Sequence, residues 1–285
     1  MASLDHKVDF AIVFSVTKAN PNGDPLNGNR PRQNYDGYGE VSDVALKRKI
    51  RNRLLDMEES IFVQSNDKKA DEFNSLKERA DANEELVAAL KGKKNNAELY
   101  AEVACKTWFD VRSFGQVFAF KGAGKGVSVG VRGPVSIHTA TSIDPIDITS
   151  MQITKSVNSE TSESKGSDTM GMKHRVDFGV YKFYGSINTQ LAEKTGFSNE
   201  DALKLKNALI TLFENDASSA RPDGSMEVLK VCWWEHNSRL GQYSSAKVHR
   251  LLEINKLKDE PKSSEDYEII VHELDGLKVE IIDGQ

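Results

Sequence analysis

Residues 8–17, VDFAIVFSVT, alternate between large apolar side chains and mostly smaller or polar ones. The large apolar set is Val8, Phe10, Ile12, Phe14 and Val16. A period of two residues is typical of a half-buried strand. The chain is therefore expected to build its fold on a sheet that packs one face of this strand against a core.

Two later segments have the periodicity of helices. In 43–56, Leu46, Ile50 and Leu54 recur at helical spacing and predict one buried stripe. In 198–215, Ser198 begins a second periodic run and indicates a capping box at its start. Both helices are expected to lie on the same side of the sheet.

Three further segments, 127–140, 175–187 and 227–236, have strand patterns. With the first strand and the two helices they give the order β-α-β-β-α-β. This order predicts an α+β fold with a ferredoxin-like core, which RNA-recognition domains share. One face of such a sheet carries no helix and offers a surface to a single nucleic-acid strand.

The rest of the chain is expected to elaborate one domain, residues 1–285. Residues 57–102 read as an acidic helical insertion whose weak apolar stripe covers the core rather than builds one. The polar stretch within 155–175 predicts a protruding hairpin. Residues 243–285 form a C-terminal extension with two short strands.

The net charge of −5 on 285 residues hides a split along the chain. Residues 1–55 carry nine basic against six acidic side chains, and residues 103–258 carry twenty against sixteen. The acidic excess lies in 56–102, with twelve acids against seven bases, and in 259–285, with nine against two. The overall charge therefore does not exclude a nucleic-acid partner.

Several classes of protein are disfavoured. No stretch approaches the roughly 20 apolar residues of a membrane span, and the first residues lack the apolar core of a signal peptide. Cys105 and Cys232 are too few for a disulfide framework or a four-thiolate zinc site. A cytoplasmic protein without membrane contact is expected.

Signals for an enzyme are weak. The six histidines are scattered, and KGAGKG at 121–126 does not fit the spacing of a phosphate-binding loop. Asp144 and Asp147 can share a cation, but aspartate beside proline is more typical of a turn. No catalytic residue, metal or cofactor is expected.

Signals for RNA binding are individually non-specific. RSFGQVFA at 112–119 agrees with part of the RNP1 pattern, although its two phenylalanines fit a core equally well. The basic side chains of helix 43–56 suit a phosphate backbone or a solvated face. Trp234 suits base stacking, unless the C-terminal extension covers it.

In combination these stretches resemble a known family. NPNGDP (20–25), GNRPR (28–32) and DVALKRKIRN (43–52) resemble the start of the backbone subunit of type I-C CRISPR effector complexes, also called Cascade. That family belongs to the repeat-associated mysterious protein superfamily. The later blocks that resemble it are FDVRSFGQVFA (109–119), VRGPVSI (131–137), MGMKHRVDFGVY (170–181) and YGSI (184–187).

The resemblance implies a non-enzymatic, hand-shaped subunit that lines up head to tail with copies of itself along a CRISPR RNA. It presents the guide for pairing with target DNA, beside other Cascade subunits, in antiviral defence. The core would be the palm, 57–102 at least part of the fingers, and 155–175 the thumb, which presses on the RNA at a neighbouring subunit. The residues expected to contact RNA are Asn20, Asn22, Gly23, Arg30, Arg32, Lys47, Arg48, Lys49, Arg51, Arg112, Phe114, Lys125, Met170, Met172, Lys173 and His174.

Two alternatives stay open. An endoribonuclease of the same superfamily, which matures the guide, would need a general acid or base, and His174 is the candidate with a suggestive context. A stand-alone single-stranded RNA-binding protein would bind as a monomer and form no array.

Overall fold

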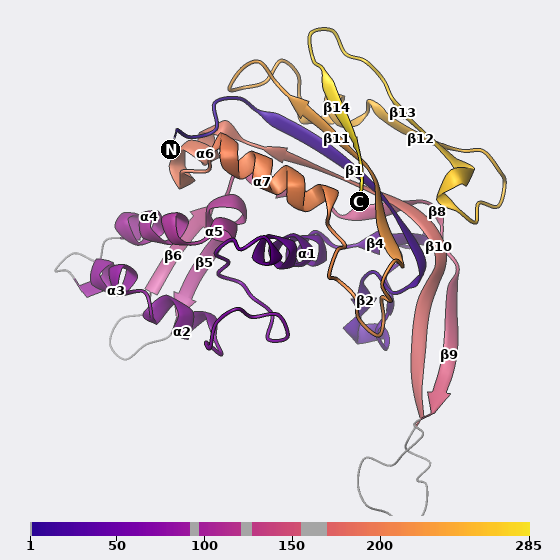
Figure 1. Cartoon of the computed structure of the whole chain (residues 1–285), viewed down its shortest axis with the longest axis horizontal. Coiled ribbons are helices and arrows are strands. Elements are labelled where there is room, and N and C mark those ends of the chain that lie inside the picture. The colour runs from indigo at the N-terminus through magenta and orange to yellow at the C-terminus, as the bar shows by residue number, and fades with distance from the viewer. Residues whose placement is uncertain (1, 92–96, 121–126, 155–169) are drawn as a thin grey trace, which may run out of the picture.

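The computed structural model describes residues 2–91, 97–120, 127–154 and 170–285 (Figure 1). These parts form a mixed α+β protein centred on one large antiparallel sheet, which confirms the predicted class in its coarse form. Lys125, one of the predicted RNA contacts, lies outside the described residues. None of the helices within these ranges is long and apolar enough to cross a bilayer.

The main sheet has the strand order β14–β11–β1–β10–β8–β4, and β7 and β9 also pair with β10. The strand predicted at 8–17 is β1, and it lies between β10 and β11 in the middle of the sheet. The strands are β1 (Val8–Ala19), β4 (Tyr38–Val41), β7 (Val135–Ile137), β8 (Ala140–Pro145), β9 (Ile148–Thr154), β10 (Met170–Ile187), β11 (Met226–Glu235) and β14 (Val279–Asp283).

Helices α1 (Asp43–Asp56), α6 (Thr189–Thr195) and α7 (Asn199–Ile210) lie on one side of this sheet (Figure 1). Their apolar stripes pack into the main core with the alternate side chains of β1. The capping box at the start of α7 is present, with Ser198 and Asp201 exchanging hydrogen bonds. Both helices predicted from periodicity are therefore confirmed, although α7 ends at Ile210 rather than 215.

The other side of the sheet is covered as well, and the expectation of an open sheet face is wrong. The C-terminal extension supplies α8 (Ser245–His249), η2 (Ser264–Asp266) and the strand pair β12 (Leu252–Lys256) and β13 (Tyr267–Val271). Trp234 is fully buried in the cluster that this extension forms with the sheet. The tryptophan is therefore core, as its alternative interpretation allows, and β1 is buried on both faces.

A buried polar cluster fastens β1 to this extension. The Asp9 carboxylate is fully buried and lies 2.8 Å from Nε2 of His236 and 2.9 Å from Nζ of Lys7. Gln242 N donates to His236 Nδ1, so Nε2 carries the proton that His236 shares with Asp9. Burial alone would raise the pKa of Asp9, but the hydrogen bonds from His236, Ser245 and Lys7 hold it below the ordinary value.

His249 lies beside this cluster and makes stability depend on pH. Its ring stacks on Tyr184, and its Nε2 lies 3.1 Å from the Gly185 carbonyl and 3.7 Å from Asp9 Oδ1. Burial lowers the pKa of His249 below the ordinary value. The unfolded chain therefore binds more protons at this residue, and stability falls as the pH drops below about 6.5, at most about 1.4 kcal/mol per pH unit.

Replacing His249 by phenylalanine keeps the stacked ring and removes the titrating group. We expect the loss of unfolding free energy between pH 7.5 and 5.5 to be smaller in His249→Phe than in the wild type. Urea unfolding followed by circular dichroism measures this difference. The exposed His272→Phe variant is the control, and an unchanged pH dependence in His249→Phe would contradict the assignment.

Residues 57–120 build a second core, so the expectation that the insertion merely covers the first is wrong. Phe62, Leu86, Tyr100, Trp108 and Phe118 are its large members. The segment contains α2 (Leu76–Asp81), α3 (Glu84–Lys91), α4 (Ala97–Thr107) and α5 (Phe109–Phe114). They pack on a separate ribbon of β5 (Gly115–Phe120) and β6 (Val127–Arg132).

This ribbon also corrects one strand prediction and contains part of the stretch that agrees with the RNP1 pattern. The single strand expected over 127–140 is divided: β6 leaves the main sheet to pair with β5, and only β7 belongs to the main sheet. The stretch that agrees with the RNP1 pattern spans α5 and β5, and β5 lies outside the main sheet. Phe118 is buried in the second core, as its structural interpretation allows.

Candidate nucleic-acid interface

The loop of residues 20–37 is compact and internally tied. It contains the short pair β2 (Gly23–Asp24) and β3 (Arg30–Pro31), joined by the turn η1 (Pro25–Asn27). Asn20 is buried, and its Nδ2 donates to the Asn29 carbonyl at 2.7 Å. A Cβ placed on Gly23 would lie 1.9 Å from Asn29 Oδ1 and 3.0 Å from the Asn29 carbonyl oxygen, so glycine allows the close approach of these two residues in this arrangement.

Asn22 fastens this loop to helix α1. Its Oδ1 accepts from both the backbone N and the hydroxyl of Ser42, the N-cap residue of α1. Asn20, Asn22 and Gly23 therefore shape the loop and fix it at the start of the helix. These contacts give a structural reason for three residues of the NPNGDP block, Asn20, Asn22 and Gly23.

The loop meets the hairpin of β9 and β10 at a three-residue cluster. Arg30 Nη1 donates to Ser150 Oγ at 2.7 Å, and His174 Nδ1 lies 2.8 Å from the same oxygen. Ser150 and His174 are direct partners in the β9–β10 register. Two residues predicted separately as RNA contacts, Arg30 and His174, are therefore brought together by a serine.

The described strands of the hairpin leave the body of the molecule beyond this cluster (Figure 1), and Ile153, Met170 and Met172 near their ends are exposed. Met170 and Met172 share a face with His174 because they alternate along β10, and they are 58% and 55% exposed. Lys173 lies on the opposite face of β10. The stretch expected to form the hairpin tip, 155–169, lies outside the described residues.

The basic residues of α1 divide into two groups. Lys47 pairs with Asp43 at 3.0 Å within the helix, and Arg48 has no ion pair with any residue that the structure describes. Lys49 is buried, pairs with Asp216 and lies over the Phe213 ring. Burial lowers the pKa of Lys49 to about 8.

Lys49, Arg51 and Arg112 are consequently structural in this conformation, which corrects their expected place on the surface. Arg51 Nε donates to the buried Asp110 at 2.8 Å, and Arg112 Nη2 donates to Asp201 at 2.8 Å. Their guanidinium groups also lie over aromatic rings. All three cations already have a carboxylate partner inside the protein, so they do not belong to the surface that we propose below.

Phe114 and Arg32 are also engaged within the protein. Phe114 is half-buried, packs against the main core and lies 5.2 Å beneath the Arg51 guanidinium, so its structural interpretation is the one observed. Arg32 lies 3.3 Å from Asp24 and is half-exposed. Phe114 therefore belongs to the core, whereas the guanidinium of Arg32 lies near the loop surface.

The sequence reasoning missed Ser150 and three apolar residues around the loop. Leu26 and Tyr35 are almost completely exposed, at 98% and 105%, and Val44 on α1 is 68% exposed. Large exposed apolar side chains that gather in one region mark an interaction surface. The alternation of side chains along β9 and β10 is visible in the sequence, but only the pairing register of the two strands places Ser150 opposite His174.

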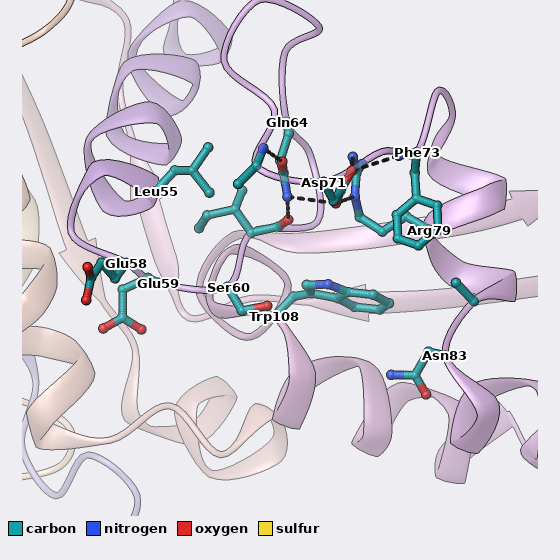
Figure 2. Close-up of a pocket in the computed structure, with 13 residues that line it drawn as sticks. Leu55, Glu58, Glu59, Ser60, Gln64, Asp71, Phe73, Arg79, Asn83 and Trp108 are labelled. Carbon is teal, nitrogen blue, oxygen red and sulfur yellow. Dashed lines mark hydrogen bonds and ion pairs between the residues drawn. The ribbon is translucent and has the colours of Figure 1, made fainter.

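A cavity of about 560 Å³ lies at the other end of α1, between that helix and the insertion (Figure 2). Leu55, Phe73 and Trp108 supply apolar walls, and Gln64, Asp71 and Arg79 form a hydrogen-bonded row along one side. Glu58 and Glu59 lie at its edge (Figure 2). Glu59 pairs with Lys204, whereas Glu58 is exposed and has no ion pair with a described residue.

Metal-binding geometry is not found in the described ranges, where no three His, Cys, Asp or Glu side chains are grouped to hold an ion. Asp144, one of the two aspartates considered above, accepts from the Tyr267 hydroxyl at 2.8 Å and lies 3.4 Å from Lys256. These contacts connect β8 to the C-terminal extension. Asp144 is therefore occupied by protein groups.

Fold and surface together define a class: an α+β protein on one large antiparallel sheet, with a projecting hairpin and a cationic cluster at its root. The model of the family "CRISPR-associated protein Cas7" matches residues 6–272, and the chain belongs to that family. A relative from Haloferax volcanii with the same description is 24% identical over 265 residues, covering 87% of this chain and 75% of the relative.

A solved structure described as "CRISPR RNA-guided surveillance complex, pre-nicking" contains a chain of similar fold. The TM-score is 0.51 at 17% sequence identity, and the match covers 80% of this chain and 75% of that one. At this identity the likeness shows the shared fold.

Proposed function

We propose that this chain is the guide-RNA-binding backbone subunit of a type I-C CRISPR surveillance complex. Copies line up head to tail along the spacer part of a CRISPR RNA, beside other subunits of the complex, and present the guide to target DNA in the cytoplasm. The Arg30–Ser150–His174 cluster at the root of the hairpin carries this proposal. It joins two of the sequence blocks that resemble the family, NPNGDP-GNRPR and MGMKHR.

The surface suits a ligand whose sequence varies. A guide must be held by its phosphates and its shape, because every spacer sequence has to be accepted. Arg30, Arg48 and Lys173 offer positive charge on the loop, on α1 and on the hairpin, while Met170 and Met172 offer flexible apolar contact. None of these groups is arranged as a base-reading pair.

The parts of the proposed hand follow the fold. The palm is the ferredoxin-like unit of β1, α1, β7–β8, β10, α7 and β11, and the fingers are α2–α4 with the β5–β6 ribbon. The hairpin of β9 and β10 is the thumb. The C-terminal extension, 243–285, completes the palm by covering its second face, so the RNA path runs over the loop and the hairpin rather than the sheet.

Head-to-tail assembly is supported by two unlike surfaces at the two ends of α1. The cationic, apolar loop lies at its start, and the cavity with Glu58 at its edge lies at its end, about 20 Å away for a helix of this length. Complementary patches at different places on one chain produce an open, repeating assembly.

Reversing the charge of Glu58 is expected to weaken assembly. We expect Glu58→Lys to bind a short RNA normally and to need roughly tenfold more protein to fill a long one, because the new charge repels the cationic loop of the next copy. Mass photometry on short and long RNAs measures both. Glu227→Lys, an exposed reversal on β11, is the control, and equal filling by both variants would count against this interface.

Binding to several single-stranded RNAs of scrambled sequence tests the proposal itself. We expect similar affinity for all of them, RNA that stays intact, and affinity that falls with salt. Strong preference for one sequence would contradict backbone recognition. The placement of His174 beside Arg30 favours the endoribonuclease as second candidate, and cleavage of precursor RNA that His174→Ala abolishes would establish it.

A further inference from the structure

The hydrogen bonds around Ser150 depend on where one proton lies. A guanidinium can only donate, so Ser150 Oγ accepts from Arg30, and the hydroxyl proton of Ser150 must go elsewhere. The Nδ1 atom of His174 lies 2.8 Å from that oxygen. Three arrangements follow, two with a neutral imidazole and one with a protonated imidazole.

With a neutral imidazole whose proton is on Nε2, Nδ1 accepts the hydroxyl proton of Ser150. The serine then has no proton left for a ligand. With a neutral imidazole whose proton is on Nδ1, or with a protonated imidazole, Nδ1 donates to Ser150 Oγ instead, and the hydroxyl proton of Ser150 is released. Only the protonated imidazole also carries a positive charge. Relative to the Nε2–H tautomer, charging His174 therefore adds a positive charge and frees the hydroxyl donor of Ser150 at the same place.

The Nε2 side of His174 faces Gly28 of the loop. A Cβ placed on Gly28 would lie 4.0 Å from Nε2, and this residue has a φ of +58°, which favours glycine. No side chain at position 28 therefore covers the ring. Only the protonated state combines the Arg30 guanidinium, the released hydroxyl of Ser150 and a positive charge on His174, which suits the oxygens of one phosphate group bound beside Ser150.

We infer that Arg30, Ser150 and His174 form a proton-coupled phosphate site, in which binding of a backbone phosphate is accompanied by protonation of His174. This inference rests on the proposed function for the identity of the phosphate, an RNA backbone group. It adds a serine that was not among the predicted contacts and makes the affinity depend on pH.

The charged groups around His174 agree with an anion site. On β3, Arg30 reaches it through Ser150, and the neighbouring Arg32 is held by Asp24 of β2. On its own strand, Arg175 and Asp177 lie 3.4 Å apart on the opposite face, where Asp177 also accepts from Thr149 of β9. Among the described residues, no carboxylate is in direct contact with the His174 ring.

Linkage fixes the direction of the effect. If phosphate binding favours the protonated imidazole, affinity must rise as the pH falls, by at most tenfold per pH unit for one proton. The neutral state remains able to bind through Arg30. Binding is therefore tuned by pH rather than switched off.

The first arm of the test measures binding of a short fluorescent RNA of scrambled sequence between pH 8 and pH 6. We expect wild-type protein to bind roughly tenfold more tightly at pH 6. His174→Gln should bind with nearly constant affinity, and His174→Arg should bind tightly at both pH values. His272→Gln is the matched control and should keep the wild-type pH dependence. Equal pH dependence in wild type and His174→Gln would overturn the inference and leave the proposed function standing.

The second arm uses inorganic phosphate and does not depend on RNA. In protein with ¹³C-labelled histidine, the His174 resonance is assigned by its loss in His174→Gln. Phosphate, compared with chloride at equal ionic strength, should raise the pH midpoint of that resonance in wild type, and raise it less in Ser150→Ala. An unmoved midpoint would overturn the phosphate site. Protein that binds no RNA at any pH but passes this arm would contradict the proposed function alone.

Discussion

Replacing Asp110 by alanine is expected to destabilise the protein by about 3–5 kcal/mol, the cost of leaving one member of a buried ion pair alone. The Asp110 carboxylate is completely buried and accepts from Arg51 Nε at 2.8 Å. It also accepts from the backbone N of Phe62 at 2.7 Å and of Val63 at 3.1 Å. One side chain therefore holds helix α1, helix α5 and the start of the insertion together.

The loss should be visible as a fall in the thermal midpoint of about 10 °C for a domain of this size. Asp110→Asn keeps an acceptor for one backbone group and should lose less than the alanine variant. Asp81→Ala removes an exposed i,i+4 partner of Lys77 and should cost at most about 0.5 kcal/mol. A thermal midpoint for Asp110→Ala close to that of Asp81→Ala would contradict this account of how the insertion is anchored.

Removing the charge of Arg30 is expected to have the second large effect, this time on function. Without this charge-assisted hydrogen bond to a phosphate, binding of a short RNA should weaken by about tenfold. In an array each copy lacks the same hydrogen bond, so the losses multiply along one RNA and regular arrays should disappear at concentrations that suffice for the wild type. The effect should be equal for RNAs of different sequence.

Binding titrations at several salt concentrations measure the change directly. The slope of log affinity against log salt should become shallower by about 0.7 for each phosphate that the protein no longer neutralises. Arg239→Ala removes an exposed arginine that pairs with Glu193 far from the loop, and it should behave like the wild type. If Arg30→Ala and Arg239→Ala bind long RNA equally well, the loop is not part of the RNA path.

The elements that could be predicted from the sequence are those fixed by neighbouring residues. The alternation of 8–17 and the stripe of 43–56 each match an observed element, and the capping box of α7 depends on residues only three apart. The burial of β1 on both faces could not be predicted in the same way. The second cover comes from α8 and β12–β13, which lie more than two hundred residues further along the chain.

The same limit applies to the candidate site: its basic residues could be predicted, but their long-range partners could not. The basic residues of 43–56 were visible in the sequence, but their partners were not, because Lys49 pairs with a residue 167 positions away and Arg51 with one 59 positions away. Only the tertiary structure separates these internal pairs from the cations left on the surface. Arg30 and Ser150 could not be paired from the sequence either, because they are 120 positions apart. They come into contact only because the loop packs on the hairpin.

The number of copies bound to RNAs of increasing length tests the central proposal most directly. Mass photometry should show that the bound mass rises in equal steps of one 31.7 kDa chain as the RNA is lengthened, and electron micrographs of the longest complexes should show a regular helical array. The RNA recovered from these complexes should have its original length. One bound copy at every RNA length, or shortened RNA, would contradict the assignment of this chain as a guide-coating backbone subunit.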